Sequence, residues 1–147
     1  MCGGVQFTHQ DRDYRFYFPN PKAVLPVKMR TGEVRLLPWG RRKQQVGRLP
    51  MGGWARQDSI YAGKWDRFFP IPVKLLIFSY MEKNFQGESK WYEVGGQNII
   101  QGLVASDAHE QRVYVVTIEP DVLDCDHDRL PLIKGVMGGR LHNVYMR

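Results

Sequence analysis

The close spacing of proline and glycine residues limits the fold of this chain more than any other feature. Nine prolines and fifteen glycines are spread along 147 residues. Both residue types interrupt the regular backbone that a long helix needs. The intervening runs are short and apolar, β-branched or aromatic, a composition that favours strands. We therefore expect many short strands and little helix.

Five of these runs are predicted to be strands. They are Val34–Leu37, Val73–Phe78, Lys90–Val94, Ile99–Ala105 and Val113–Ile118. The adjacent Gly95-Gly96 pair tolerates the positive φ angles of tight turns, so the third and fourth strands are expected to form a hairpin. Helix is predicted only over Arg56–Trp65, which has weak helical spacing, and over Val122–Asp124 as a single turn after Pro120.

The length of the chain fits one domain, residues 1–147, because single cores typically take about 100–150 residues. The sequence contains no internal repeat and no linker long enough to divide it. The predicted fold class is α+β, as a β-rich single domain with few short helices.

The charge balance favours a polyanionic partner. The chain carries 21 Lys+Arg against 15 Asp+Glu, a net charge of +6, so nucleic acid is the first candidate and an acidic membrane surface the second. No apolar run approaches the roughly 18 residues that span a bilayer, and the first residues are too polar for a secretory signal. We expect a cytoplasmic protein whose two cysteines, Cys2 and Cys125, stay reduced.

Cys2 is the residue with the most distinctive chemistry. Removal of Met1 would leave a residue that carries both a free α-amine and a thiol. Their ordinary pKa values are about 7.7–8.0 and about 8.5, so both groups are nucleophilic near neutral pH. Such an aminothiol condenses with an aldehyde to a Schiff base, and the thiol then closes a thiazolidine ring. Gly3 and Gly4 add no side chains beside it, so the backbone there can pass close to a ligand.

Five segments together resemble the motifs of the SOS-response-associated peptidase (SRAP) family in order and approximate spacing. They are Met1–Gly4 (MCGG), Pro38–Gly40 (PWG), Trp54–Arg56 (WAR), Ser79–Lys83 (SYMEK) and Asp126–Pro131 (DHDRLP). The last, similar to the family's I-H-D-R-[MR]-P, is the most specific. The resemblance covers nearly the whole chain, which is short for the family and typical of a divergent, phage-type member. It implies a barrel-like mixed or antiparallel sheet.

The resemblance implies a sensor of abasic sites in single-stranded DNA. Cys2 would be the nucleophile that forms a thiazolidine cross-link, and would also take part in removing Met1. Glu82 would be the general acid/base and His127 the proton donor to the opening sugar ring, roles that suit a carboxyl group and an imidazole. No metal or other cofactor is implied, and we expect the partner to be abasic single-stranded DNA, bound by a monomer.

Contacts to DNA are predicted from arginines and aromatic side chains. Arg56 and Arg129 match family arginines and would hold the phosphates that flank the lesion. Trp39, Trp54 and Trp65 are candidates for base stacking, although at least half of the four tryptophans should be structural. The basic run Arg41-Arg42-Lys43 beside Trp39 combines phosphate-binding charge with an aromatic face.

The sequence departs from the family pattern at two positions close to this chemistry. Trp54 stands where the family has an asparagine expected to bind the cross-linked nucleotide, and an indole can donate one hydrogen bond but accept none. Gly4 replaces an arginine, which removes a phosphate contact. Asn20 offers an amide in a neighbouring segment.

Other interpretations of the same residues are open. Glu82 could be the solvated end of a strand, and His127 could be a surface histidine or, with Cys125, part of a metal site. The protein could be a single-strand-binding module that lost the chemistry, which Trp54 and Gly4 would explain. It could also be a hydrolase in which Cys2 or Cys125 is the nucleophile and His127 the base.

Overall fold

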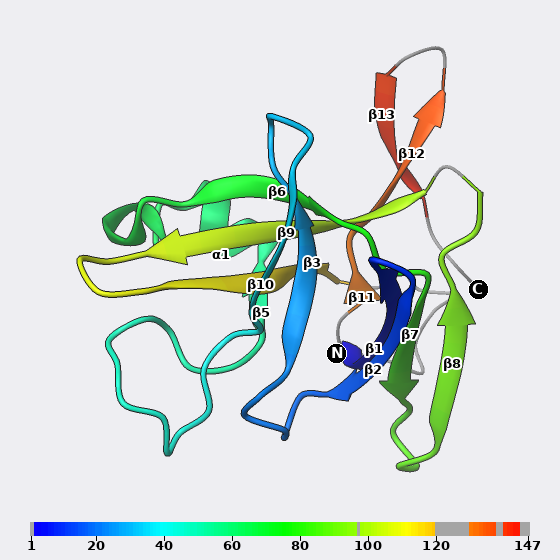
Figure 1. Cartoon of the computed structure of the whole chain (residues 1–147), viewed down its shortest axis with the longest axis horizontal. Coiled ribbons are helices and arrows are strands. Elements are labelled where there is room, and N and C mark those ends of the chain that lie inside the picture. The colour runs from blue at the N-terminus through cyan, green and yellow to red at the C-terminus, as the bar shows by residue number, and fades with distance from the viewer. Residues whose placement is uncertain (1, 97, 120–129, 138–139, 145–147) are drawn as a thin grey trace.

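Two β-sheets packed against each other make up most of the molecule (Figure 1). The computed structural model describes residues 2–96, 98–119, 130–137 and 140–144. The predicted β-rich fold with few short helices is confirmed, because within these residues the helical elements are only α1 (Gln57–Tyr61) and η1 (Asp66–Phe68), a single turn of 3-10 helix. None of the helices in the described part of the chain is long and apolar enough to cross a membrane.

The smaller sheet is antiparallel and has the strand order β2-β1-β7-β8. Its strands are β1 (Cys2–His9), β2 (Arg12–Tyr17), β7 (Ser79–Lys83) and β8 (Ser89–Glu93). Gln10 and Asp11, both at positive φ, form the two-residue turn between β1 and β2. The turn between β7 and β8 is held by the Asn84 side chain, whose Oδ1 accepts hydrogen bonds from the backbone N–H groups of Gln86 and Glu88.

The larger sheet has nine strands, and its main path runs β11-β10-β9-β6-β3-β4. The strands on this path are β3 (Val24–Lys28), β4 (Val34–Pro38), β6 (Ile71–Leu75), β9 (Ile99–Ser106), β10 (Gln111–Ile118) and β11 (Leu130–Pro131). The others are β5 (Trp54–Arg56), which runs parallel to β10, and the hairpin of β12 (Ile133–Met137) and β13 (Arg140–Val144).

The larger sheet curls back on itself without closing. Trp39, one residue beyond β4, makes an isolated parallel bridge to Val113 of β10, and the Gly40 N–H donates a 2.8 Å hydrogen bond to the Val113 carbonyl. This single bridge, rather than a ladder, brings the two ends of the sheet together. Within the described residues the sheet is therefore strongly curved and barrel-like, but it is not a closed barrel.

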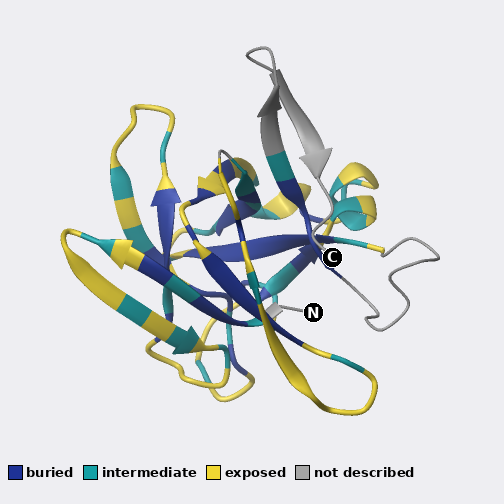
Figure 2. Ribbon diagram, turned by 90° about the vertical axis from the view of Figure 1, so that its right-hand side faces the viewer, coloured by how far each residue is buried: buried dark blue, intermediate teal, exposed yellow. Residues whose placement is uncertain are grey.

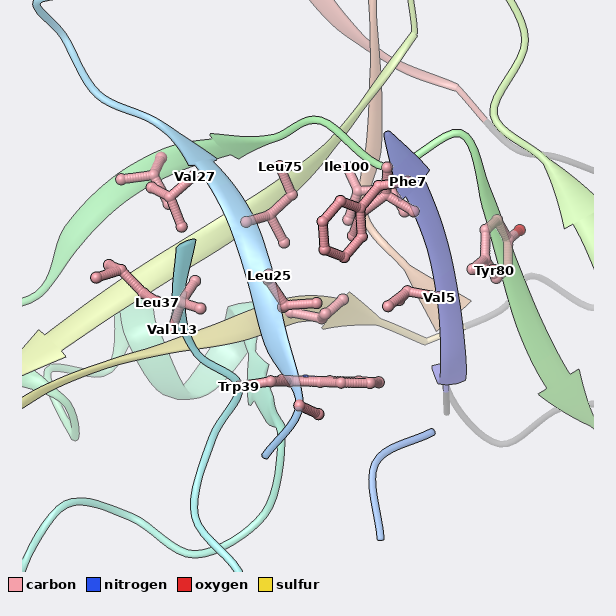
Figure 3. Packing of buried hydrophobic residues seen from close by; sticks show 14 of the residues in the cluster. Val5, Phe7, Leu25, Val27, Leu37, Trp39, Leu75, Tyr80, Ile100 and Val113 are labelled. Atoms are coloured by element: carbon pink, nitrogen blue, oxygen red, sulfur yellow. The ribbon is translucent and has the colours of Figure 1, made fainter. Parts of the chain in front are cut away.

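The main hydrophobic core lies between the two sheets (Figure 3). Val5 and Phe7 of β1 alternate with outward-facing residues, as a strand with one buried face requires. They meet Leu25 of β3 and Leu75 of β6 from the opposite sheet, and all four are fully buried. This packing fixes the position of β1, whose first residue is Cys2.

A second core lies on the outer face of the larger sheet. Leu103, Tyr114 and Val116 of β9 and β10 are buried there beneath Trp65 and Ile60, which come from the segment that contains α1 and η1. Both faces of β9 and β10 are thus covered, and Figure 2 shows these strands buried along most of their length. Among the described residues, no comparable segment covers the rest of the outer face.

All five predicted strands overlap observed ones, and α1 lies inside the predicted Arg56–Trp65 helix. The predicted hairpin is wrong. β8 pairs with β7 in the smaller sheet, whereas β9 pairs with β6, β10 and β12 in the larger one. β8 is largely exposed, whereas β9 is buried on both faces, so the two strands belong to different sheets. The segment that contains Gly95 and Gly96 connects the two sheets. The predicted turn over Val122–Asp124 lies outside the described residues.

Candidate functional site

The backbones of Cys2 and Glu82 lie opposite each other on neighbouring strands. Cys2 begins β1, and its partner across the antiparallel pairing with β7 is Glu82. The fold therefore brings together two residues that are 80 positions apart in the sequence.

A β-bulge at Gly3 produces this register. Gly4 pairs with Met81, so a regular ladder would place Gly3 opposite Glu82; instead Gly3 is the extra residue, and Glu82 pairs with Cys2. A bulge bends its strand and changes the direction of the next side chain. The Gly3 carbonyl accepts a 3.0 Å hydrogen bond from the Phe18 N–H, which ties the bulged strand to the segment after β2.

The Glu82 side chain is fully buried. Tyr80, two residues earlier on β7, belongs to the core between the sheets, so the period of the strand directs Glu82 to the same interior side. The interpretation of Glu82 as a solvated strand end is therefore wrong. Glutamate is rarely buried completely, because a carboxyl group without water needs specific partners. A buried carboxyl group beside the start of β1 is well placed to transfer protons there.

Arg56 is exposed and forms a surface ion pair. Its guanidinium donates to both carboxylate oxygens of Asp58, at 3.2 and 2.9 Å, and lies 3.8 Å from Glu119. The hydrogen bonds and charge of Asp58 raise the pKa of Arg56, which stays protonated. Because more than half of the Arg56 side chain is exposed, the ion pair contributes little stability and can be exchanged for a phosphate.

An aromatic cluster of Phe18, Trp39 and Trp54 adjoins the bulge. The Phe18 ring packs edge-on against Trp54 at 4.8 Å and lies 5.3 Å from Trp39. Trp39 is fully buried and its Nε1 donates a 3.0 Å hydrogen bond to the Gly53 carbonyl. A base cannot stack on a buried ring, so the predicted stacking role of Trp39 is corrected to a core role. Trp65 is buried as well, whereas Trp54 is half-buried.

The basic run does not form the predicted phosphate-binding cluster, because two of its three side chains turn inward. Arg41 donates to the carbonyls of Leu49 and Gln45, at 2.6 and 2.9 Å. Arg42 is buried, donates to the Phe18 and Trp39 carbonyls at 2.5 and 2.6 Å, and stacks on the Phe18 ring. These contacts fasten loop 40–53 to the aromatic cluster, and only Lys43 of the run is exposed.

The environment of Arg42 also argues against a role at the protein surface. Burial, together with the positive charge of Arg112, lowers the pKa of Arg42 to about 10. The guanidinium is still protonated at neutral pH, and the two backbone carbonyls stabilise that charge. Arg41 and Arg42 are therefore corrected from DNA contacts to structural residues.

Gly4 lies beneath two aromatic side chains. A Cβ atom there would come within 3.2 Å of Tyr17 and 3.3 Å of both Met81 and Trp91. Tyr17 and Trp91 meet edge to face above it, with ring centroids 6.1 Å apart. The glycine at this position thus leaves space for the two rings, which is a packing role that the sequence did not reveal.

The remaining predicted residues, His127, Arg129 and Cys125, lie outside the described residues. The chain re-enters the described structure at Leu130 and Pro131 of β11, which pair with β10. Thr117 of β10 is in register with Pro131 and also with Arg56 of β5. Among the described residues no group of three or more histidine, cysteine or acidic side chains could hold a metal ion.

Phe18 is a member of the site that the sequence analysis missed. It contacts the bulge through its backbone, and Trp54 and Arg42 through its ring. Its position between Tyr17 and Pro19 gave no periodic signal, because it lies just beyond the end of β2.

Comparison with family models and with curated proteins finds no relative. No family model matches the chain, and no curated protein matches it. The functional interpretation therefore depends on the geometry described above and on the resemblance of the five sequence segments.

Proposed function

We propose that this protein captures abasic sites in single-stranded DNA by forming a thiazolidine with the amine and thiol of Cys2, after removal of Met1. The observation that carries the proposal is the register of β1 and β7, in which a bulge at Gly3 sets Cys2 opposite the buried Glu82. The net charge of +6 favours a polyanionic partner.

The proposed reaction is balanced and needs no oxidant or cofactor. An abasic deoxyribose opens to an aldehyde at C1′ as its ring oxygen gains a proton. The Cys2 amine adds to that carbon, and loss of one water gives an imine. The sulfur then adds to the imine carbon while the thiol proton passes to the nitrogen, which closes the five-membered ring.

Several of these steps move a proton, and Glu82 is the proposed general acid/base for them. A buried carboxyl group next to the reacting residue can take up the proton that the amine loses and return it to the departing water. His127 is the proposed donor to the ring oxygen, on the basis of the resemblance. Arg56 and Arg129 are the proposed phosphate contacts.

Intact-mass spectrometry tests the proposal. The full-length protein, with an untagged N-terminus and a mass that confirms loss of Met1, is mixed with a single-stranded oligonucleotide that holds one abasic site. We expect an adduct whose mass is the sum of protein and DNA minus one water. Absence of an adduct, or an adduct that persists in Cys2→Ala, would show that the proposal is wrong.

The role of Glu82 is tested by Glu82→Gln, which keeps the shape of the side chain and removes its acid/base function. We expect the rate of adduct formation at saturating DNA to fall by about 10²–10⁴-fold. Glu88→Gln is the matched control, because Glu88 is exposed in the turn after β7, and its rate should equal that of wild type. If wild type, Glu82→Gln and Glu88→Gln form the adduct at equal rates, Glu82 has no role in the mechanism.

A second candidate function is single-strand binding without the covalent step. Trp54 favours it, because a half-buried indole packed against Phe18 occupies the position of the family asparagine. This alternative predicts salt-sensitive binding to abasic and intact strands alike and no adduct in the mass spectrum.

A further inference from the structure

The outer face of the larger sheet carries a groove that the proposed chemistry does not use. Two hollows, of about 850 and 130 Å³, share Pro72 and Gln101 in their walls and so form one continuous surface. The larger hollow lies between the β3–β4 turn and β6, and the smaller lies between α1 and β12. We call this surface the basic groove; its cations are Lys28, Arg30, Lys74 and Lys134.

Strand alternation directs these cations away from the inner core. Val73 and Leu75 belong to that core, so Lys74 between them faces outward. Ile133 is buried in the same core, so Lys134 also lies on the outer side. The segment of α1 and η1 covers β9 and β10 but leaves the groove open.

The charge of the basic groove has one sign. None of the described residues that line the two hollows is acidic, although the chain contains 15 acidic residues. Lys28 and Lys74 are direct cross-strand partners of β3 and β6, and both are exposed. Like charges in directly opposed positions destabilise a sheet. An anion bound between them would remove that repulsion.

The groove also reaches the residue that follows Arg56 in the chain. Gln57 lines the smaller hollow and directly follows Arg56, the exposed arginine that we propose as a phosphate contact. Tyr61, whose side chain is 80% exposed, lines the same hollow and presents an aromatic ring. A line of cations with an exposed aromatic side chain is the usual composition of a surface that binds single-stranded nucleic acid.

We infer that the basic groove binds the phosphate backbone of single-stranded DNA as it runs on from Arg56 across β12, β9, β6 and β3. The inference rests on the proposed function for the identity of the polyanion. It assigns to the protein a second, non-covalent contact surface that would hold undamaged strand beside the captured lesion.

Binding of intact oligonucleotides without an abasic site tests this surface, in the full-length protein, by fluorescence anisotropy at several salt concentrations. The groove variant is Lys28→Gln with Lys74→Gln. The control is Lys22→Gln with Lys64→Gln, which removes the same charge from exposed lysines outside the groove. Each phosphate contact contributes about 0.7 to the slope of log K against log salt for single strands.

We expect the groove variant to lower that slope by about 1.4 and the affinity at about 0.1 M salt by about 25-fold, and the control to change neither. The melting temperature of the groove variant should not fall, because a like-charge pair is removed. Equal losses in both variants, or no loss in either, would overturn the inference.

The experiment separates the two proposals. If wild type forms no adduct with abasic DNA but the groove variant still weakens binding of intact strands, the covalent function is wrong and the groove stands. If the adduct forms in wild type and the groove variant binds intact strands as tightly as wild type, the groove inference is wrong and the covalent function stands.

Discussion

Gly4→Arg restores the residue that the family resemblance would place after Cys2-Gly3, and the structure predicts that it destabilises the protein. Gly4 is buried, and a Cβ atom there would already lie 3.2–3.3 Å from Tyr17, Met81 and Trp91. The rest of an arginine side chain can leave the sheet only by displacing the two aromatic rings. The substitution thus tests whether packing or lost DNA contact explains this glycine.

The expected cost can be worked out from the contacts that change. Overpacking a well-filled site costs about 1–3 kcal/mol, and loss of the Tyr17–Trp91 edge contact adds about 0.5–1.5 kcal/mol. The Arg15 guanidinium, 5.4 Å from the Trp91 ring, would lose a contact worth about 0.5–1 kcal/mol. Replacing a glycine returns about 0.4–1 kcal/mol by restricting the unfolded chain. The net loss is about 1–5 kcal/mol.

Urea denaturation of Gly4→Arg, Trp91→Ala and the double variant measures this cost and its cause. In the Trp91→Ala background one of the three close contacts and the edge contact are already gone, so the additional cost of the arginine should be smaller by about 0.5–3 kcal/mol, the coupling found between residues in contact. Wild-type stability in Gly4→Arg, or the same cost with and without Trp91, would refute the packing explanation.

Two further predictions concern Tyr114 and Arg56. The buried Tyr114 hydroxyl donates a 2.6 Å hydrogen bond to the Pro50 carbonyl, and burial raises its pKa above the ordinary value of 10.0. As the pH rises, the Tyr114 hydroxyl therefore loses its proton in the unfolded chain before it does so in the folded protein. The stabilising contribution of Tyr114 to the free energy of unfolding is complete below pH 10 and decreases above it, by up to about 1.4 kcal/mol per pH unit. Urea midpoints should show Tyr114→Phe less stable than wild type at pH 7, by about 1–2 kcal/mol, but with a flatter decline above pH 10; parallel declines would contradict the assignment. Arg56→Gln should change the urea midpoint little, because its ion pair is exposed, yet lower the salt slope for single-stranded DNA by about 0.7. Arg12→Gln, at the β1–β2 turn, is its control, and an equal effect of both would remove Arg56 from the interface.

The strands that sequence reasoning found are those whose burial is strongest. β9 and β10 are covered on both faces, so Ile99–Ala105 and Val113–Ile118 appear as nearly continuous apolar runs. β1 and β2 were not predicted. β1 begins Cys-Gly-Gly, and β2 alternates charged residues with Tyr14 and Phe16. Neither has the composition typical of a strand, and each is recognised as one only from its pairing with a neighbouring strand.

The candidate site was predicted only in part, for the same physical reason. The opposition of Cys2 and Glu82 depends on which strand pairs with β1 and on the bulge at Gly3, and both are long-range properties without a local signal. A run of charged residues, in contrast, does not show whether its side chains point toward solvent or toward the interior. Arg41 and Arg42 look like a solvated patch in the sequence, but backbone carbonyls of loop 40–53 and of the aromatic cluster bind them.

Gly4 and Trp54, where the chain departs from the motifs that it resembles, both contact the short segment of Tyr17 and Phe18. At Gly4 the missing side chain leaves space for Tyr17 and Trp91, and at Trp54 the indole packs on Phe18, whose N–H is bonded to Gly3. Tyr17 and Phe18 are consecutive, so one short segment places an aromatic ring against each substituted position. An arginine at Gly4 would displace the first ring, and an asparagine at Trp54 would leave the second without its edge contact. The two positions are therefore coupled through this segment. Gly4→Arg or Trp54→Asn alone should therefore disturb the bulge that sets Cys2 opposite Glu82.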